Sequence, residues 1–132
     1  MKAELLEIGK DFIPEIRDYT QRPIYERVRK IMVPRVKLSF NDFLRAAMEF
    51  NERMEAKGKS ARLEAKVRVV DGQVYYVLRR ADRQWKDDIP IYYNPKTQRF
   101  YIPKRYPSRR KKLTSYVIML RLAALGVKYR RV

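Results

Sequence analysis

The side chains that most enzymes use for catalysis or metal binding are scarce in this sequence. None of the 132 residues is Cys or His. This excludes disulfides, thiolate metal sites, cysteine nucleophiles and the commonest general base. Hydrolytic chemistry would therefore depend on carboxylates. The main candidates are Asp82, Asp87 and Asp88, which we expect at the end of a hairpin. No His, Gly-rich loop or conjugate base accompanies them, so they form no recognisable catalytic motif.

Arg and Lys are the residues whose number and distribution indicate a function. The chain has 32 Lys and Arg against 15 Asp and Glu, which gives a net charge of +17 at pH 7. Such a charge repels itself in a compact chain unless an anionic partner offsets it. All 15 acidic residues lie at or before Asp88, and Ile89 to Val132 contains twelve Lys and Arg with no Asp or Glu. Solvated surfaces normally mix both signs, so this segregation favours a polyanion surface.

We expect three groups of cations to contact the phosphate groups of a nucleic acid. They lie in a basic helix of the N-terminal third, in the run after Pro103 and at the C-terminal end. Such contacts release counterions and ignore base sequence, and Arg is favoured for bidentate contact. The predicted phosphate contacts are Arg22, Arg27, Arg29, Lys30, Arg105, Arg109, Arg110, Lys111, Lys112, Lys128, Arg130 and Arg131. The sequence predicts no catalytic residue, metal ligand or cofactor.

The N-terminal part, residues 1–58, is expected to form helices interrupted by prolines. One is an amphipathic basic helix that carries the first group of cations. A capping box at Ser39 and Asp42 predicts the start of another helix, and Gly58 predicts its end. Its apolar residues recur at helical spacing and are expected to face the core. These residues are Phe40, Phe43, Leu44, Ala47, Met48 and Met54.

From Arg62 the apolar period changes to two, which predicts strands. Asp71-Gly72 is a type I′ turn sequence that joins the alternating segment after Arg62 to a return strand, Gln73 to Arg80. A second strand pair is expected over Ile89 to Tyr93 and Gln98 to Ile102, joined by Asn94-Pro95-Lys96-Thr97. After the basic run, a helix is expected from about Leu113 to Leu125, ended by Gly126.

These elements predict an α+β fold with N-terminal helices, a small antiparallel sheet of two hairpins and a C-terminal helix. The length of 132 residues is enough for one domain with a modest core. We therefore expect a single domain over 1–132, with a helical part over 1–58 and the sheet and last helix over 62–132. No stretch reaches the roughly 18 to 20 apolar residues of a membrane span, so no membrane insertion is expected.

Three segments between Arg62 and Val132 resemble a known nuclease family. Lys112-Leu113-Thr114-Ser115-Tyr116 resembles the Gln-x-x-x-Tyr helix of RecB-like nucleases, and most of all that of the CRISPR-associated adaptation nucleases. In that family one strand reads Gly-x-hydrophobic-Asp and the next reads hydrophobic-Glu-x-Lys. Gly72-Gln73-Val74-Tyr75 is similar to the first strand, and Ile89-Pro90-Ile91-Tyr92-Tyr93-Asn94 is similar to the second.

The resemblance implies an inactivated nuclease, because the charged residues of the family are replaced. Tyr75 stands where the metal-binding Asp belongs, Tyr92 replaces the Glu, and Asn94 replaces the Lys that assists hydrolysis. Lys112 stands for the Gln of the motif, and Tyr116 matches its Tyr. The family's cysteine ligands for an iron–sulfur cluster have no counterpart here. Phenols in place of carboxylates leave almost no anionic oxygen for a divalent metal.

A basic, cysteine-free protein of this kind resembles the nucleocapsid proteins of filamentous viruses that infect hyperthermophilic archaea, of the Thermoproteus virus type. This resemblance implies a viral protein that coats and packages linear double-stranded DNA. It also implies a protein located in the virion, and in the host cytoplasm before assembly. Subunits would repeat along the duplex by self-association or together with a second coat subunit.

Two other functions remain open at this stage. The first is a cellular nucleic-acid-binding module, ribosome-associated or chromatin-like, in which tyrosines stack on single-stranded bases. The tyrosines available for this are Tyr75, Tyr92, Tyr93, Tyr101 and Tyr106. The second is a divergent metal-dependent nuclease, which hydrolysis dependent on added Mg²⁺ or Mn²⁺ would reveal.

Overall fold

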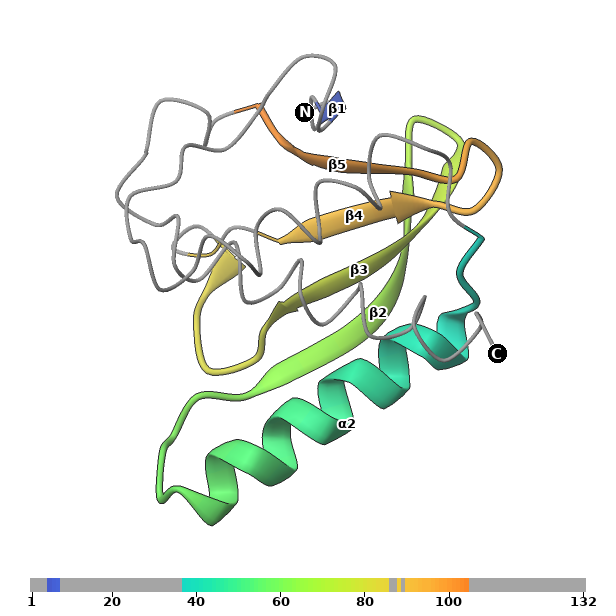
Figure 1. Cartoon of the computed structure of the whole chain (residues 1–132). Coiled ribbons are helices and arrows are strands. Elements are labelled where there is room, and N and C mark those ends of the chain that lie inside the picture. The colour runs from blue at the N-terminus through green and yellow to red at the C-terminus, as the bar shows by residue number, and fades with distance from the viewer. Residues whose placement is uncertain (1–4, 8–36, 86–87, 89, 105–132) are drawn as a thin grey trace, which may run out of the picture.

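The computed structural model describes residues 5–7, 37–85, 88 and 90–104. In this part the chain forms one helix and a five-stranded antiparallel sheet with the strand order β1-β5-β4-β3-β2 (Figure 1). The elements are β1 (Leu5–Glu7), α2 (Phe40–Ala56), β2 (Leu63–Val70), β3 (Gln73–Arg80), β4 (Ile91–Asn94) and β5 (Arg99–Pro103). The expected α+β class is confirmed.

Helix α2 begins where the capping box predicts. Ser39 has extended backbone angles, and its hydroxyl accepts a hydrogen bond from the Asp42 backbone N–H at 3.2 Å. The Asp42 carboxylate in turn accepts one from the Ser39 N–H at 2.8 Å. These two bonds satisfy backbone donors that the first turn of a helix leaves free. The helix ends at Ala56, just before Gly58, whose φ of +67° favours glycine.

Both predicted hairpins are present. In the first, β2 and β3 pair up to Val70↔Gln73 around the two-residue turn Asp71-Gly72, where both φ angles are positive (50° and 77°), as a type I′ turn requires. In the second, β4 and β5 pair from Tyr92↔Tyr101 to Asn94↔Arg99. The β3–β4 pairing joins the two hairpins into one sheet.

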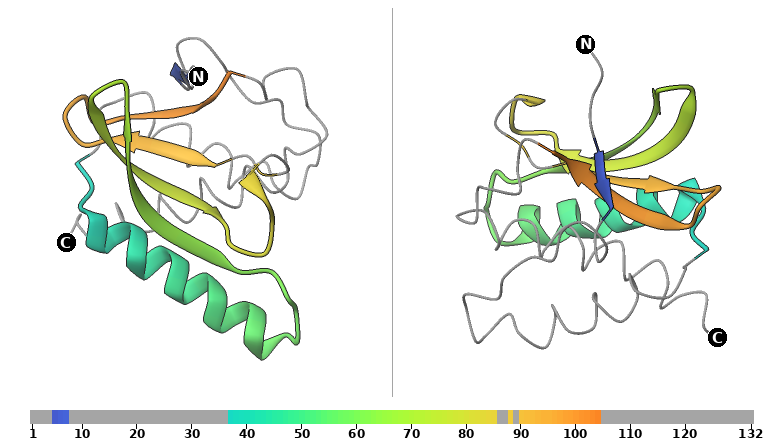
Figure 2. Two further views of the ribbon diagram at one scale, coloured as in Figure 1. Left: turned by 180° about the vertical axis from the view of Figure 1, so that it is seen from behind. Right: turned by 90° about the horizontal axis from the view of Figure 1, so that it is seen from above.

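The sheet buries residues on both faces, and α2 covers part of one (Figure 2). On the helix side, Phe43 packs against Tyr76 and Tyr93, with ring centroids 5.9 and 5.6 Å apart. The Tyr93 hydroxyl accepts a hydrogen bond from the Leu38 N–H at 3.0 Å, which ties the chain before α2 to β4. The alternate residues of the strands form the opposite face, whose core is Tyr75, Val77 and Tyr92.

The structure corrects the sequence-based prediction in two places. Leu5–Glu7 was expected to belong to a helical part, yet it forms β1 and pairs with β5 in the register Leu5↔Pro103 to Glu7↔Tyr101. A strand of three residues is too short to show an apolar period. Its partner β5 is the last described strand along the chain, so no local pattern indicates the pairing. Leu44 and Met48 were expected in the core but are exposed, because α2 faces the sheet with Phe43, Ala47 and Phe50 instead.

Some predicted elements lie outside the described residues. They are the basic helix around residues 22–30 and the C-terminal helix from about Leu113 to Leu125.

Candidate nucleic-acid interface

All twelve cations predicted to contact phosphate lie outside the described residues. They are Arg22, Arg27, Arg29, Lys30, Arg105, Arg109, Arg110, Lys111, Lys112, Lys128, Arg130 and Arg131. The described ranges contain fourteen Lys and Arg against nine Asp and Glu, a net +5 of the +17 of the whole chain. The remaining +12 belongs to the other parts of the sequence, so the described sheet and helix are themselves only moderately basic.

The structure does bring together the three residues that the nuclease resemblance assigns to metal and lysine positions. Tyr75 on β3 and Tyr92 and Asn94 on β4 lie on the sheet face opposite α2, and we call them the tyrosine cluster. The rings of Tyr75 and Tyr92 meet edge to face with centroids 5.8 Å apart, and Tyr75 meets Tyr101 of β5 in the same way at 5.7 Å. All three cluster residues are buried.

Neutral hydrogen bonds hold the tyrosine cluster. The Asn94 amide N–H donates to Gln73 Oε1 at 2.6 Å, and Asn94 Oδ1 accepts from the backbone N–H groups of Lys96 (2.8 Å) and Thr97 (3.2 Å). Burial raises the pKa of the Tyr75 hydroxyl, and a hydrogen bond with Asn94 offsets part of this rise. Tyr75 is therefore a neutral phenol at physiological pH and offers no anionic oxygen to a metal.

A cation from β2 approaches the tyrosine cluster, whose residues the nuclease resemblance assigns to the metal and lysine positions. Arg68 Nη1 donates to the Tyr92 hydroxyl at 2.6 Å, and its guanidinium lies 4.6 Å from the centre of the Trp85 ring. The Arg79 guanidinium contacts the same ring at 4.2 Å, so Trp85 makes cation–π contacts with two arginines. A guanidinium beside Tyr92 disfavours a divalent cation at this position by like-charge repulsion.

An open pocket of about 450 Å³ lies next to Tyr75. Its walls contain one acidic and one basic residue among apolar and neutral side chains, so it concentrates charge of neither sign. The lining residues are Leu5, Leu6, Val70, Asp71, Gln73, Tyr75, Tyr101 and Lys104. Among the residues that the structure describes, no three His, Cys, Asp or Glu side chains are grouped so that they could hold a metal ion.

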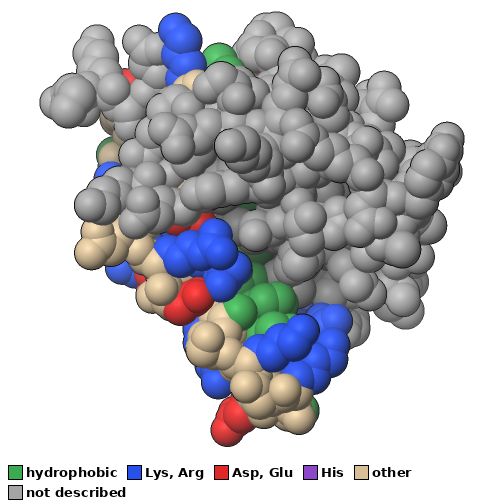
Figure 3. Space-filling view, turned by 90° about the vertical axis from the view of Figure 1, so that its left-hand side faces the viewer, with side chains coloured by type: hydrophobic (Ala, Val, Ile, Leu, Met, Phe, Trp, Pro, Cys, Tyr) green, Lys and Arg blue, Asp and Glu red, His purple; other side chains and the backbone are tan. Residues whose placement is uncertain are grey.

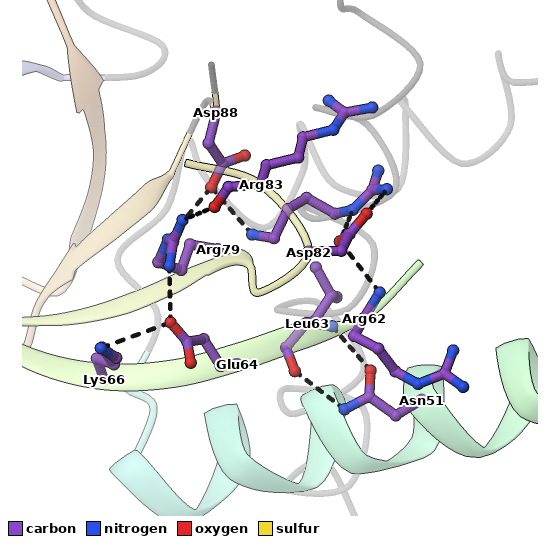
Figure 4. A network of polar contacts seen from close by, with 10 residues as sticks. Asn51, Arg62, Leu63, Glu64, Lys66, Arg79, Asp82, Arg83 and Asp88 are labelled. Carbon is purple, nitrogen blue, oxygen red and sulfur yellow. Dashed lines mark hydrogen bonds and ion pairs between the residues drawn. The ribbon is translucent and has the colours of Figure 1, made fainter. Parts of the chain in front are cut away.

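The acidic residues that sequence analysis singled out are held by arginines. Asp82 accepts from Arg80 Nε at 2.7 Å and from Arg80 Nη2 at 2.6 Å, and the backbone N–H of Arg62 donates to it at 3.2 Å (Figure 4). The hydrogen bonds from Arg80 lower the pKa of Asp82 from 3.8 to about 2. Asp88 lies 3.5 Å from Arg79 Nε and accepts from the Arg80 backbone N–H at 2.9 Å. Asp87 lies outside the described residues.

Sequence analysis missed a group of basic residues at the end of the molecule where α2 ends, β2 begins and β3 ends. We call this group the basic end; it consists of Arg53, Lys57, Lys59, Arg62 and Arg83. Figure 3 shows Lys and Arg side chains on this side, with acidic and hydrophobic side chains among them. The spacing of Lys57, Lys59 and Arg62 around Gly58 was a signal for part of the group. Arg53 and Arg83 join it only through the fold.

The elements of the basic end are fixed to one another by backbone and side-chain hydrogen bonds. The Asn51 amide of α2 bonds both the N–H (2.8 Å) and the C=O (2.9 Å) of Leu63 at the start of β2 (Figure 4). The Ala81 N–H donates to the Arg62 C=O at 2.8 Å, which joins the end of β3 to the same point. Arg62 Nη1 donates to the C=O groups of Lys59 and Ala61. Hydrogen bonds thus join the ends of α2, β2 and β3 that carry the basic end.

Comparisons with models of protein families, with curated proteins and with solved structures find no match to this chain. In the described part of the chain, no helix is long and apolar enough to cross a membrane.

Proposed function

We propose that this protein coats double-stranded DNA as a nucleocapsid protein, by phosphate neutralisation without regard to base sequence, and that it does not cleave the DNA. The observation that carries the proposal is the net charge of +17, with basic residues more than twice as numerous as acidic ones. A polyanion is the partner that such a charge fits. The resemblance to archaeal virus nucleocapsid proteins points to the same partner.

The tyrosine cluster supports binding without hydrolysis. Hydrolysis by two metals needs several anionic oxygens at one point, and here the positions are filled by two phenols and an amide with Arg68 beside them. Because Asp82 and Asp88 are engaged by Arg80 and Arg79, they do not supply the missing ligands. A nuclease-like sheet of this kind would keep its DNA-facing cations and lose its chemistry.

Base stacking on the sheet receives less support from the structure. Tyr75, Tyr92 and Tyr93 are between 0% and 8% exposed, so their rings pack inside the protein and have no free face for a base. Tyr106 lies outside the described residues. Phosphate contacts from the basic segments and the basic end therefore form the proposed interface.

The test is a titration of unrelated DNA duplexes of equal length at several salt concentrations, followed by sedimentation. B-form DNA carries one negative charge per about 1.7 Å, so a subunit of net charge +17 neutralises at most about 17 phosphates. If half to all of this charge acts on DNA, saturation falls at one subunit per roughly 4 to 9 base pairs. Affinities for the different duplexes should agree within about threefold.

Three results would contradict this proposal. They are a hundredfold preference for one sequence, saturation at one subunit per 30 or more base pairs, and a clear preference for single-stranded RNA. DNA cleavage that needs Mg²⁺ or Mn²⁺ and survives repurification would contradict the loss of catalysis. Electron microscopy of the complex with linear DNA tests for filaments, which a coat protein forms and a solitary DNA-binding module does not.

A further inference from the structure

Five large apolar side chains of the described residues are exposed, and they lie on three adjoining elements. Their exposed fractions range from 38% to 66%. We call them the apolar patch: Leu44 and Met48 on α2, Val67 and Val69 on β2, and Val74 on β3. A group of exposed apolar side chains is a common mark of a protein–protein contact, whereas single ones are ordinary.

The members of the apolar patch are neighbours in space. Val69 and Val74 are directly paired across β2 and β3, and Val67 lies on the same sheet face two residues before Val69. Helix α2 runs antiparallel to β2, since Asn51 bonds Leu63 while Phe40 and Phe43 contact Tyr76, the partner of Val67.

Helix geometry then places the helical members. Leu44 lies two turns before Asn51 on the same side of α2, about 10 Å back along the helix. A length of about 10 Å corresponds to three to four residues of a strand, so Leu44 lies beside Val67, which follows Leu63 on β2 by four residues. Met48 follows Leu44 one turn later. The five side chains thus form a continuous surface along the junction of α2 with β2.

Charge identifies what this surface can bind. The stripe of Leu44 and Met48 continues one turn further into Glu52 and Glu55, which are both exposed and take part in no ion pair among the described residues. Helix α2 as a whole carries four acidic and two basic residues, a net −2 in a chain of net +17. Glu52 and Glu55 therefore favour contact with a cationic protein over contact with a phosphate backbone on this side of α2.

We propose that the apolar patch is the site where a second copy of this chain docks, with basic residues of that copy facing Glu52 and Glu55. The inference rests on the proposed coating of DNA, because subunits that lie side by side on a duplex can contact each other only through a surface that does not face the DNA. A second copy is the cationic protein present at the highest local concentration there. Two free copies of net charge +17 repel each other, so docking accompanies DNA binding.

The experiment compares binding of the full chain to a short duplex, of the length that one subunit occupies at saturation, with binding to one of about 100 base pairs. The long duplex reports cooperativity between neighbours, and the short one reports the affinity of a single subunit. The variants are Met48→Gln, which keeps the charge, and Glu52→Gln/Glu55→Gln, which raises the net charge by two. The matched control is Ser60→Lys/Gln84→Lys, which raises the charge equally at exposed positions outside α2.

We expect wild-type protein to bind the long duplex cooperatively. Both test variants should lower the cooperativity by about tenfold, the effect expected of side chains that carry much of the energy of an interface. Met48→Gln should leave binding to the short duplex unchanged. The glutamate variant should strengthen it, and the control, whose new lysines adjoin the basic end, should strengthen it at least as much. Circular dichroism checks that every variant is folded.

The outcomes separate this inference from the function on which it rests. Wild-type protein that binds neither duplex would overturn the coating of DNA and the docking together. Cooperative binding that both test variants retain at the level of the control would overturn the docking alone, and so would wild-type binding without cooperativity.

Discussion

At the scale of single residues, Asp82 shows how the fold uses an acidic side chain in a basic protein. It lies among arginines at the end of β3, where Arg80 makes two hydrogen bonds to it. These bonds favour the ionised carboxylate and lower its pKa to about 2. The unfolded chain has no such pair, so its Asp82 takes up a proton at a higher pH. The ion pair therefore stabilises the fold most when the pH is above about 4.

Asp82→Asn should reduce the free energy of unfolding by about 0.2 to 1 kcal/mol near neutral pH, as expected for a pair that is partly in water. A carboxyl of lowered pKa stabilises the fold above its unfolded pKa, and this contribution is lost as the pH falls through the folded value. The difference between wild type and variant should therefore shrink between pH 4 and pH 2. Urea unfolding at a series of pH values measures it. In an Arg80→Gln background the trend should be weaker, because only backbone N–H donors then remain to Asp82. A trend of undiminished size there would assign the effect to another group.

The sequence predicted that the residues of the tyrosine cluster share one face of the sheet, but it did not predict which side chains contact them. Because side chains alternate along strands, Tyr92 and Asn94 must share a face, and the antiparallel pairing of β3 with β4 brings Tyr75 to it. The approach of Arg68 and the position of Trp85 depend on a third strand and on the chain after β3. No local pattern encodes such contacts, since they arise when separate segments pack.

At the scale of elements, Asn51 joins the one described helix to the strand at the sheet edge. Its side-chain amide donates to the Leu63 C=O and accepts from the Leu63 N–H, so a single residue satisfies both backbone groups at the start of β2. Leu63 is buried, and water cannot replace these bonds without opening the contact between α2 and β2.

Asn51→Ala should destabilise the protein by about 2 kcal/mol, because two backbone groups lose their partners at a buried residue. Glu52→Ala, the exposed neighbour on the same helix, is the matched control and should change the stability by less than about 0.5 kcal/mol. Chemical denaturation with circular dichroism gives both values. Equal stability of the two variants would show that Asn51 does not hold the element junction.

Elements whose conformation is fixed by a few neighbouring residues were predicted well from the sequence. The capping box at Ser39 and the Asp71-Gly72 turn each fix a backbone conformation within a few residues, and both are as predicted. Apolar periodicity predicted a helix from Ser39 onwards, but it wrongly placed Leu44 and Met48 in the core. The sheet is too narrow at β2 to cover Leu44 and Met48 as well as Phe43 and Phe50. Burial depends on the extent of the partner surface, which sequence spacing does not encode.

At the scale of the whole molecule, charge is distributed by segment. The described residues have a net charge of +5, and the remaining segments supply +12. If the protein coats DNA, the greater part of the phosphate contacts belongs to those segments, and the basic end adds contacts from the folded sheet and helix.

Two fourfold alanine variants test this division. Arg109, Arg110, Lys111 and Lys112 form one set, and Arg53, Lys57, Lys59 and Arg83 form the other. Each lost phosphate contact lowers the slope of log affinity against log salt by about 0.9, so each variant should flatten the slope by up to about 3 to 4 units. Duplex titration over a range of salt concentrations measures the slope. A set whose removal leaves the slope unchanged faces water and not DNA.

The pairing of β1 with β5 has a consequence for the order of folding. The two hairpins close locally, but Leu5 meets Pro103 only after nearly the whole described chain has been brought together. Closing so long a loop is entropically unfavourable, so this pair should form after the barrier to folding has been crossed. In stopped-flow experiments Leu6→Ala should then speed unfolding and leave the refolding rate almost unchanged. On the ribosome, the first of the described strands to be synthesised would thus be the last of them to pair.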